Sequence, residues 1–145
     1  DGSQVDGPRM RDGGLDGGFW VIFTAQGPLT PAGYAQARDT ALLRAVSIHT
    51  MVAANPDTFG LARTAAEARA VGESGRNVVL LAIENSYPLG DDLTLLSTFA
   101  KLGVRLVGPV HTGVNQFADS STAPPRWNGL SPAGRELVKE ANRLG

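Results

Sequence analysis

The sequence predicts an α/β fold with a parallel sheet, and three observations favour it. Six successive apolar residues, 78–83, are typical of a strand buried on both faces, as in the centre of a parallel sheet. Two other strand-like runs, 19–24 and 104–110, are separated from this one by stretches with helical spacing and helix-capping residues. Strands that alternate with helices indicate right-handed crossovers, and therefore parallel strands.

Composition limits the possible classes of protein. The 145 residues are 42% hydrophobic and 19% charged, with a net charge of -1, which is typical of one soluble globular domain. This balance gives no electrostatic footprint for nucleic acid or a membrane surface. No apolar run approaches the roughly 20 residues that cross a bilayer. Cysteine is absent, so disulfides and thiolate metal sites are excluded.

The first strand is expected over residues 19–24, an aromatic and β-branched run that follows Gly17 and Gly18. Before it, Pro8 is expected to open a short helical turn. A dinucleotide-binding fingerprint needs its glycines after a strand and at the start of a helix. Because these glycines precede the strand, that class of function is not supported.

A long helix is expected over residues 31–54, because Thr30 is a good N-cap and Pro31 suits the first helical position. Its apolar residues recur at steps of three and four, which predicts a buried stripe of Tyr34, Ala41, Ala45, Ile48 and Val52. His49 lies beside this stripe and is expected to be a helix-face residue rather than a ligand. A second, shorter helix is expected over about 62–71.

The later elements are expected in the order strand, helix, strand, loop and helix. They are a strand over 77–84, a helix from an Asp91 cap to about Leu102, a strand over 104–110, a loop through Trp127, and a helix from Pro132 to Leu144. Pro109 lacks an N–H group, so the third strand is expected to pair poorly or bulge near its end.

Two reactive residues end neighbouring strands. Glu84 ends the strand over 77–84, and His111 follows the strand over 104–110. The carboxyl ends of parallel strands meet at one edge, and neighbouring strands lie about 5 Å apart, so the two side chains are expected to converge. A carboxylate beside an imidazole suits metal binding or acid–base catalysis. The alternatives are a helix-capping or solvent-exposed carboxylate and a loop histidine bonded to backbone.

Several stretches resemble the renal or membrane dipeptidase family in its order and spacing, along nearly the whole chain. They are residues 8–20 (PRMRDGGLDGGFW), 83–90 (IENSYPLG), 103–105, 111–120, 129–132 and 140–145. The resemblance implies a (β/α)8 barrel that holds two zinc ions and hydrolyses dipeptides through a hydroxide bridging the two metals. Glu84 matches the glutamate that bridges both ions in this family. His111 matches the histidine that contacts the substrate or its tetrahedral intermediate.

The same resemblance suggests further features of the protein. Tyr87 and Asn115 are expected to line the substrate pocket. The sequence Glu84 to Tyr87 stands where many members have Glu-Gly-Gly-His, which resembles a bacterial variant and leaves the side-chain preference for the dipeptide open. A bacterial cytoplasmic or periplasmic location and a homodimer are further expectations.

The chain also departs from the family pattern. The His-x-Asp pair of the first barrel strand has no match, and neither do the two later metal-binding histidines. A complete barrel takes about 250 residues. Residues 1–145 are therefore expected to be a single internal segment of the barrel domain, completed by flanking segments or a companion chain. The alternatives are another metal-dependent amidohydrolase-type barrel enzyme, and a non-catalytic barrel fragment or pseudoenzyme.

Overall fold

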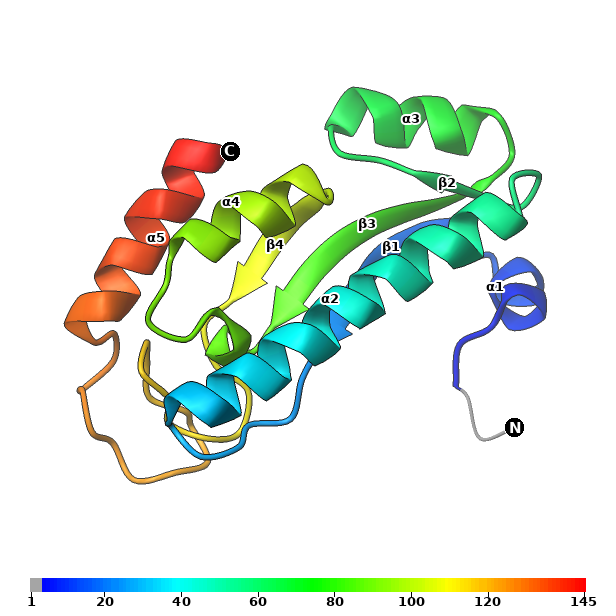
Figure 1. The fold of residues 1–145 in the computed structure, drawn as a ribbon. Helices are drawn as coiled ribbons and strands as arrows, with labels where there is room; N and C mark the ends of the chain where they lie inside the picture. Colours follow the sequence, from blue (N-terminus) through cyan, green and yellow to red (C-terminus); the bar gives the residue numbers. More distant parts are fainter. Residues whose placement is uncertain (1–3) are drawn as a thin grey trace.

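The computed structural model describes residues 4–145 and shows a four-stranded sheet with helices α2 and α4 lying across one of its faces (Figure 1). The elements in chain order are α1 (Gly7–Gly13), β1 (Gly17–Phe23), α2 (Pro31–Ala54), β2 (Phe59–Leu61), α3 (Ala65–Glu73), β3 (Asn77–Glu84), the 3₁₀ turn η1 (Tyr87–Leu89), α4 (Thr94–Lys101), β4 (Val104–Gly108) and α5 (Pro132–Leu144). Within the described residues, none of these helices combines the length and apolar character needed to cross a bilayer.

Strand β3 is the centre of the sheet, and every pairing it makes is parallel. On one side β1 pairs with it in a single register, from Gly17 opposite Val78 to Phe23 opposite Glu84. The other side is shared, with β2 beside the amino-terminal end of β3 and β4 beside its carboxyl end. The predicted parallel sheet and its crossover helices are thus confirmed.

The two faces of the sheet differ in how they are covered. On the helix side, alternate residues of β3 are buried: Val79, Leu81 and Ile83. They pack with Ala41 and Ala45 of α2 and with Leu96 and Phe99 of α4 in one core cluster. The opposite face carries Phe19, Val21 and Leu106, which are 45%, 42% and 50% exposed. The covered face therefore holds the core, and the other face is open.

Capping explains the helix limits that were predicted correctly. The Thr30 hydroxyl accepts a hydrogen bond from the Gly33 N–H at 3.2 Å, and α2 begins at Pro31 as expected. Ser131 does the same for α5, accepting from the Gly134 N–H at 2.9 Å. Along α2 the predicted stripe faces the sheet, with Ala41 and Ala45 fully buried.

Several elements differ from the prediction, for local reasons. The first strand begins at Gly17, because Gly17 and Gly18 pair with β3 instead of leading into the strand. Strand β2 was not predicted, and α3 begins only at Ala65, where Thr64 caps it through the Glu67 N–H. Helix α4 begins at Thr94, whose N–H and hydroxyl donate to Asp92; Asp91 is not the cap.

A further difference lies in β4, which ends at Gly108 rather than at 110. Pro109 follows immediately, and its missing N–H cannot continue the ladder with β3. The expected weak pairing at the end of this strand is therefore confirmed.

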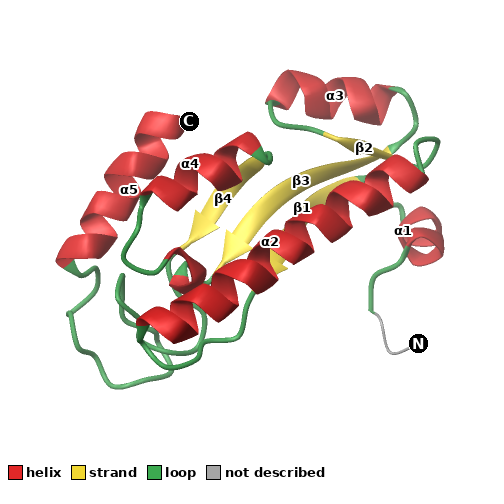
Figure 2. Cartoon of the chain, viewed as in Figure 1, coloured by secondary structure: helices red, strands yellow, loops and turns green. Residues whose placement is uncertain are grey.

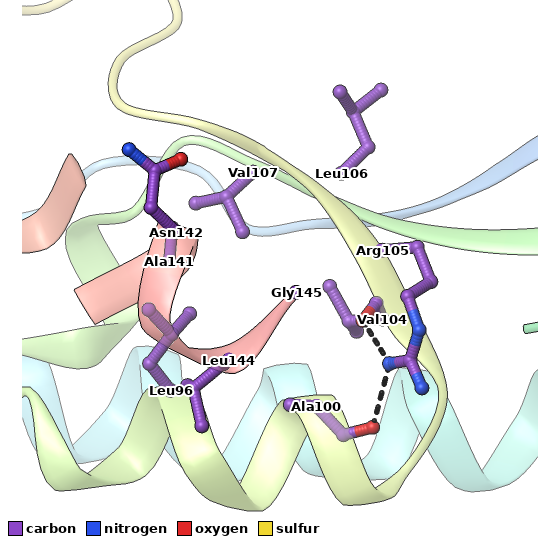
Figure 3. Close-up of a pocket in the computed structure, with 10 residues that line it drawn as sticks. All are labelled: Leu96, Ala100, Val104, Arg105, Leu106, Val107, Ala141, Asn142, Leu144 and Gly145. Carbon is purple, nitrogen blue, oxygen red and sulfur yellow. Dashed lines mark hydrogen bonds between the residues drawn. The ribbon is translucent and has the colours of Figure 1, made fainter. Parts of the chain in front are cut away.

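A groove of about 280 Å³ runs between α4, β4 and α5 (Figure 3). Its walls are mainly apolar and include Leu96, Val104 and Leu144. At one end the Arg105 guanidinium donates to the carbonyl oxygens of Ala100 at 2.9 Å and Val104 at 2.7 Å, which ties α4 to the start of β4. This groove lies along the side of β4, and neither Glu84 nor His111 lines it.

Candidate active site at the carboxyl end of the sheet

Strands β1, β3 and β4 point the same way, and the loops that leave them gather at one end of the sheet (Figure 2). In parallel α/β folds this is the end that carries the chemistry, because several loops meet there on a rigid base.

Glu84 and His111 meet at this end, as predicted. The His111 Nδ1 lies 2.8 Å from the Glu84 Oε1, and the two side chains are 42% and 44% exposed. The Phe23 ring packs edge-on against the imidazole, with the ring centroids 5.0 Å apart. A reactive acid and imidazole therefore lie together, oriented by an aromatic neighbour and open to an incoming molecule. The His111 ring is thus bonded to a carboxylate rather than to backbone, whereas Glu84 is also a solvent-exposed carboxylate, and the functional roles of both residues stay predictions.

Backbone pairing and two serine hydroxyls hold the segments that carry the pair. Glu84 lies opposite Gly108 in the last register position between β3 and β4. Beyond this position the Ser86 hydroxyl donates to the Gly108 carbonyl at 3.0 Å. The Ser120 hydroxyl donates to the His111 carbonyl at 2.9 Å, which fixes the backbone beneath the imidazole.

Tyr87 lies inside the protein. It is 1% exposed, and its hydroxyl donates to the Pro28 carbonyl at 2.7 Å. Its ring packs edge-on against Tyr34 at 5.3 Å, and burial raises the pKa of Tyr87 above its ordinary value. These contacts join η1 to the start of α2. The predicted role of Tyr87 in the substrate pocket stays a prediction.

Asn115 is also buried, at 0% exposure, and its side chain forms hydrogen bonds with other residues of the protein. Its side-chain oxygen accepts from the N–H groups of Phe117 at 2.8 Å and Ala118 at 3.1 Å. Its amide nitrogen donates to Asn85 and Pro109. Its substrate-pocket role likewise stays a prediction, and the contacts show that it organises the loop after β4.

The sequence did not single out Asn85, which the structure places directly behind Glu84. Asn85 is 1% exposed and has a φ of 68°, in the left-handed region that asparagine tolerates better than most residues. The one available signal was an asparagine immediately after a buried strand, where a turn residue with positive φ is common.

The loop between β4 and α5 is held by Asp119. Its carboxylate accepts from the N–H groups of Arg126 at 2.7 Å, Trp127 at 3.0 Å and Gly129 at 3.0 Å. Burial acts to raise the pKa of Asp119, but these N–H groups outweigh it and hold that pKa below its usual value. The Trp127 indole donates to the Asn115 carbonyl at 2.9 Å, so this loop is anchored beside the site.

His49, the other histidine, lies away from the site, as expected. Its Nε2 is 2.7 Å from the Leu102 carbonyl, so it joins α2 to the end of α4.

The described residues do not form a complete metal centre. Within residues 4–145, no three His, Cys, Asp or Glu side chains are grouped so that they could hold an ion. Glu84 and His111 supply one carboxylate and one imidazole, whereas a catalytic zinc takes about three protein ligands. Residues 4–145, the part of the chain that the structure describes, therefore do not fit a two-metal site by themselves.

A parallel α/β sheet with a carboxylate and an imidazole at its carboxyl end is an arrangement that also occurs in part of a (β/α)8 barrel, whose active sites lie at that end. The model of the membrane dipeptidase family, peptidase family M19, matches residues 1–145, and the chain belongs to this family.

Relatives and solved structures agree with this assignment. The chain is 36% identical to the dipeptidase aclJ of Aspergillus oryzae, over 98% of this chain and 35% of that protein. It is 30% identical to the dipeptidase verJ of Clonostachys rogersoniana, over 99% of this chain and 39% of that protein. The chain thus spans between a third and two fifths of the length of these two relatives.

Two crystal structures are similar in fold to the described residues. The probable dipeptidase PvdM of Pseudomonas aeruginosa superposes with a TM-score of 0.89 at 32% identity, covering 97% of this chain and 38% of that one. A metallopeptidase of Rhodobacter sphaeroides, solved with a phosphinate mimic of the dipeptide L-Ala-D-Ala, has a TM-score of 0.82 at 31% identity, covering 99% and 48%. The fold class, part of an α/β barrel, is confirmed.

Proposed function

We propose that residues 1–145 form part of a zinc-dependent dipeptidase that hydrolyses the peptide bond of free dipeptides. The observation that supports this most directly is the Glu84–His111 pair, 2.8 Å apart at the open carboxyl end of a sheet in a member of the dipeptidase family. The metallopeptidase solved with a dipeptide mimic supports a dipeptide as the substrate class.

Glu84 and His111 take different roles in this proposal. Glu84 is a metal ligand whose two oxygens could each bind one ion, and its exposed position on the open face leaves it accessible. His111 donates a hydrogen bond to the oxygen on which negative charge develops, an interaction worth about 3–4 kcal/mol in comparable sites. When bound, a pair of zinc ions would supply hydroxide near neutral pH and polarise the scissile carbonyl.

The remaining ligands must come from outside the described residues, because these contain no grouped set of three. We therefore propose that the rest of the barrel, in flanking segments or a companion chain, completes the site. The open sheet face, with its exposed Phe19, Val21 and Leu106, is the surface that such segments would cover.

Replacement of Glu84 by glutamine tests the proposal in the complete polypeptide that carries residues 1–145. Glu84→Gln should lower both metal content and L-Ala-D-Ala hydrolysis by more than about 10²-fold, since even outer-shell changes at metal sites cost 10–100-fold. The variant should still fold, and metal-free variant and metal-free parent should melt at similar temperatures, because Glu84 lies outside the core.

Glu73→Gln, at the exposed end of α3, is the matched control and should behave like the parent protein. A Glu84→Gln protein with the parent's metal content and turnover would contradict the assignment. Hydrolysis of a cyclic amide in preference to L-Ala-D-Ala would instead favour an amidohydrolase.

A further inference from the structure

Two buried asparagines, one immediately after Glu84 and one four residues after His111, bond to each other. The Asn115 Nδ2 donates to the Asn85 Oδ1 at 3.0 Å, and the two residues are 0% and 1% exposed. A buried amide left without a partner costs about 1–3 kcal/mol, so a bonded pair in this position holds its segments firmly together.

This amide pair joins the first residue after each of three strands. Asn85 itself follows Glu84, the last residue of β3, and its Nδ2 donates to the carbonyl of Thr24, which follows β1, at 3.2 Å. The Asn115 Nδ2 also donates to the carbonyl of Pro109, which follows β4, at 2.8 Å. The ends of β1, β3 and β4 are thus fixed to one another by two side chains.

Side chains matter here because the regular ladder between β3 and β4 ends at Gly108, and the Ser86 N–H continues the backbone pairing with a bond to the Pro109 carbonyl at 3.2 Å. Pro109 has no N–H of its own to donate, so its backbone takes part in this pairing only as an acceptor. Glu84 is the last residue of β3 in the ladder and His111 lies beyond it. The separation between them therefore depends on what holds the strand ends after the ladder.

We propose that Asn85 and Asn115 are positioning residues, whose amide–amide hydrogen bond sets the separation of the Glu84 carboxylate and the His111 imidazole. The inference rests on the proposed dipeptidase function and adds to it the groups that orient the reacting pair.

The hydrogen bonding of Asn115 favours positioning over substrate binding. A side-chain amide has two N–H groups and an oxygen with two lone pairs. In Asn115 all of these groups are used. The nitrogen donates to Asn85 and Pro109, and the oxygen accepts from the N–H groups of Phe117 and Ala118. No polar group of this side chain is left to bind a dipeptide.

Asn85→Gly tests the proposal in the complete zinc-loaded polypeptide, with L-Ala-D-Ala as the substrate. Glycine keeps the left-handed backbone without strain and removes only the amide. Since a misplacement of about 1 Å can cost about 10²-fold in rate, kcat should fall by that order, with KM within about threefold of the parent. A crystal structure of the variant should show the Glu84–His111 separation lengthened beyond hydrogen-bonding distance.

Asn128→Gly is the matched control, because Asn128 is the other non-glycine residue with positive φ among the described residues, and it is exposed in the loop between β4 and α5. It should leave kcat, KM and the Glu84–His111 separation unchanged. Asn115→Asp is a second test, which keeps the bonds from Phe117 and Ala118 but removes the donors to Asn85 and Pro109. It should lower kcat in the same way.

Three outcomes would overturn the inference. One is a folded Asn85→Gly or Asn115→Asp protein whose kcat stays within threefold of the parent. Another is a rise in KM at unchanged kcat, which would make the amides substrate-binding groups. A parent protein that does not hydrolyse dipeptides would overturn this inference and the proposed function together, whereas an active parent with unaffected variants would overturn this inference alone.

Discussion

The two ends of the sheet are held together in different ways. At the amino-terminal end, Gly17 of β1 and Gly60 of β2 both lie opposite Val78. The packing is so close that a Cβ on Gly17 would clash with Val78 of β3, and a Cβ on Gly60 would clash with Val71 of α3. At the carboxyl end, side-chain amides and hydroxyls bridge the strands, and Glu84 and His111 remain exposed. The contrast indicates that one end provides stability through close packing, while the other is organised by polar contacts around a reactive pair.

His111→Ala, at the carboxyl end of the sheet, should have the largest effect on activity. Loss of the proposed hydrogen bond to the developing oxyanion should lower kcat and kcat/KM together by about 10²–10³-fold. Metal content and melting temperature should be unchanged, as the imidazole lies on the surface. Steady-state kinetics and metal analysis of the purified complete polypeptide measure this. Lost metal would make His111 a ligand, and unchanged kinetics would remove it from the site.

Gly60→Ala should give a smaller effect, on the stability of the fold rather than on kcat. An alanine Cβ at this position would lie 2.7 Å from both methyl carbons of Val71, so α3 must shift. Such overpacking typically costs about 1–3 kcal/mol. Chemical denaturation should therefore show lower stability, while kcat of the folded protein is retained.

Gly72→Ala is the control for this change. The site lies in α3 with nothing near the new Cβ, and alanine there should stabilise the helix by about 0.5–1 kcal/mol. If Gly60→Ala lowered kcat without loss of stability, the assignment of stability to the amino-terminal end and of the reactive pair to the carboxyl end would be wrong.

Asp119→Asn should give the smallest effect, visible in its pH dependence. The folded-state pKa of Asp119 is lowered, so its contribution to stability is complete above the ordinary carboxyl pKa and is lost as pH falls through the folded value. The variant should melt below the parent at neutral pH, and the gap should close in acid. Melting temperatures measured across that range check the sign. A gap that widens in acid would contradict it.

The sequence predicted the elements with strong local signals. Thr30 with Pro31 and Ser131 with Pro132 set the helix starts correctly, because capping is a local interaction. The meeting of Glu84 and His111 followed from the rule that parallel strands end at the same edge. Glu84 and His111 were therefore predictable as a pair from the sequence, although their ligand and substrate roles stay predictions.

Features that depend on tertiary contacts were missed. The three residues Phe59–Leu61 are too short to show strand periodicity, and β2 exists because β3 offers an edge for them. Gly17 and Gly18 were expected to lead into the first strand, yet they pair with β3. The sequence did not single out Asn85, since its partners at Thr24 and Asn115 lie far away in the sequence.

The central place of β3 also has a consequence for folding kinetics. Its contacts with β4 join residues 23 positions apart, as in Leu81 with Val104, whereas those with β1 join residues 61 positions apart, as in Gly17 with Val78. Closing the longer chain segment costs more entropy, by about 0.6 kcal/mol for each doubling of length. The unit of β3, α4 and β4 should therefore form earlier than the docking of β1. Val104→Ala should accordingly slow folding, with a φ-value well above that of Ile22→Val, which should mainly speed unfolding.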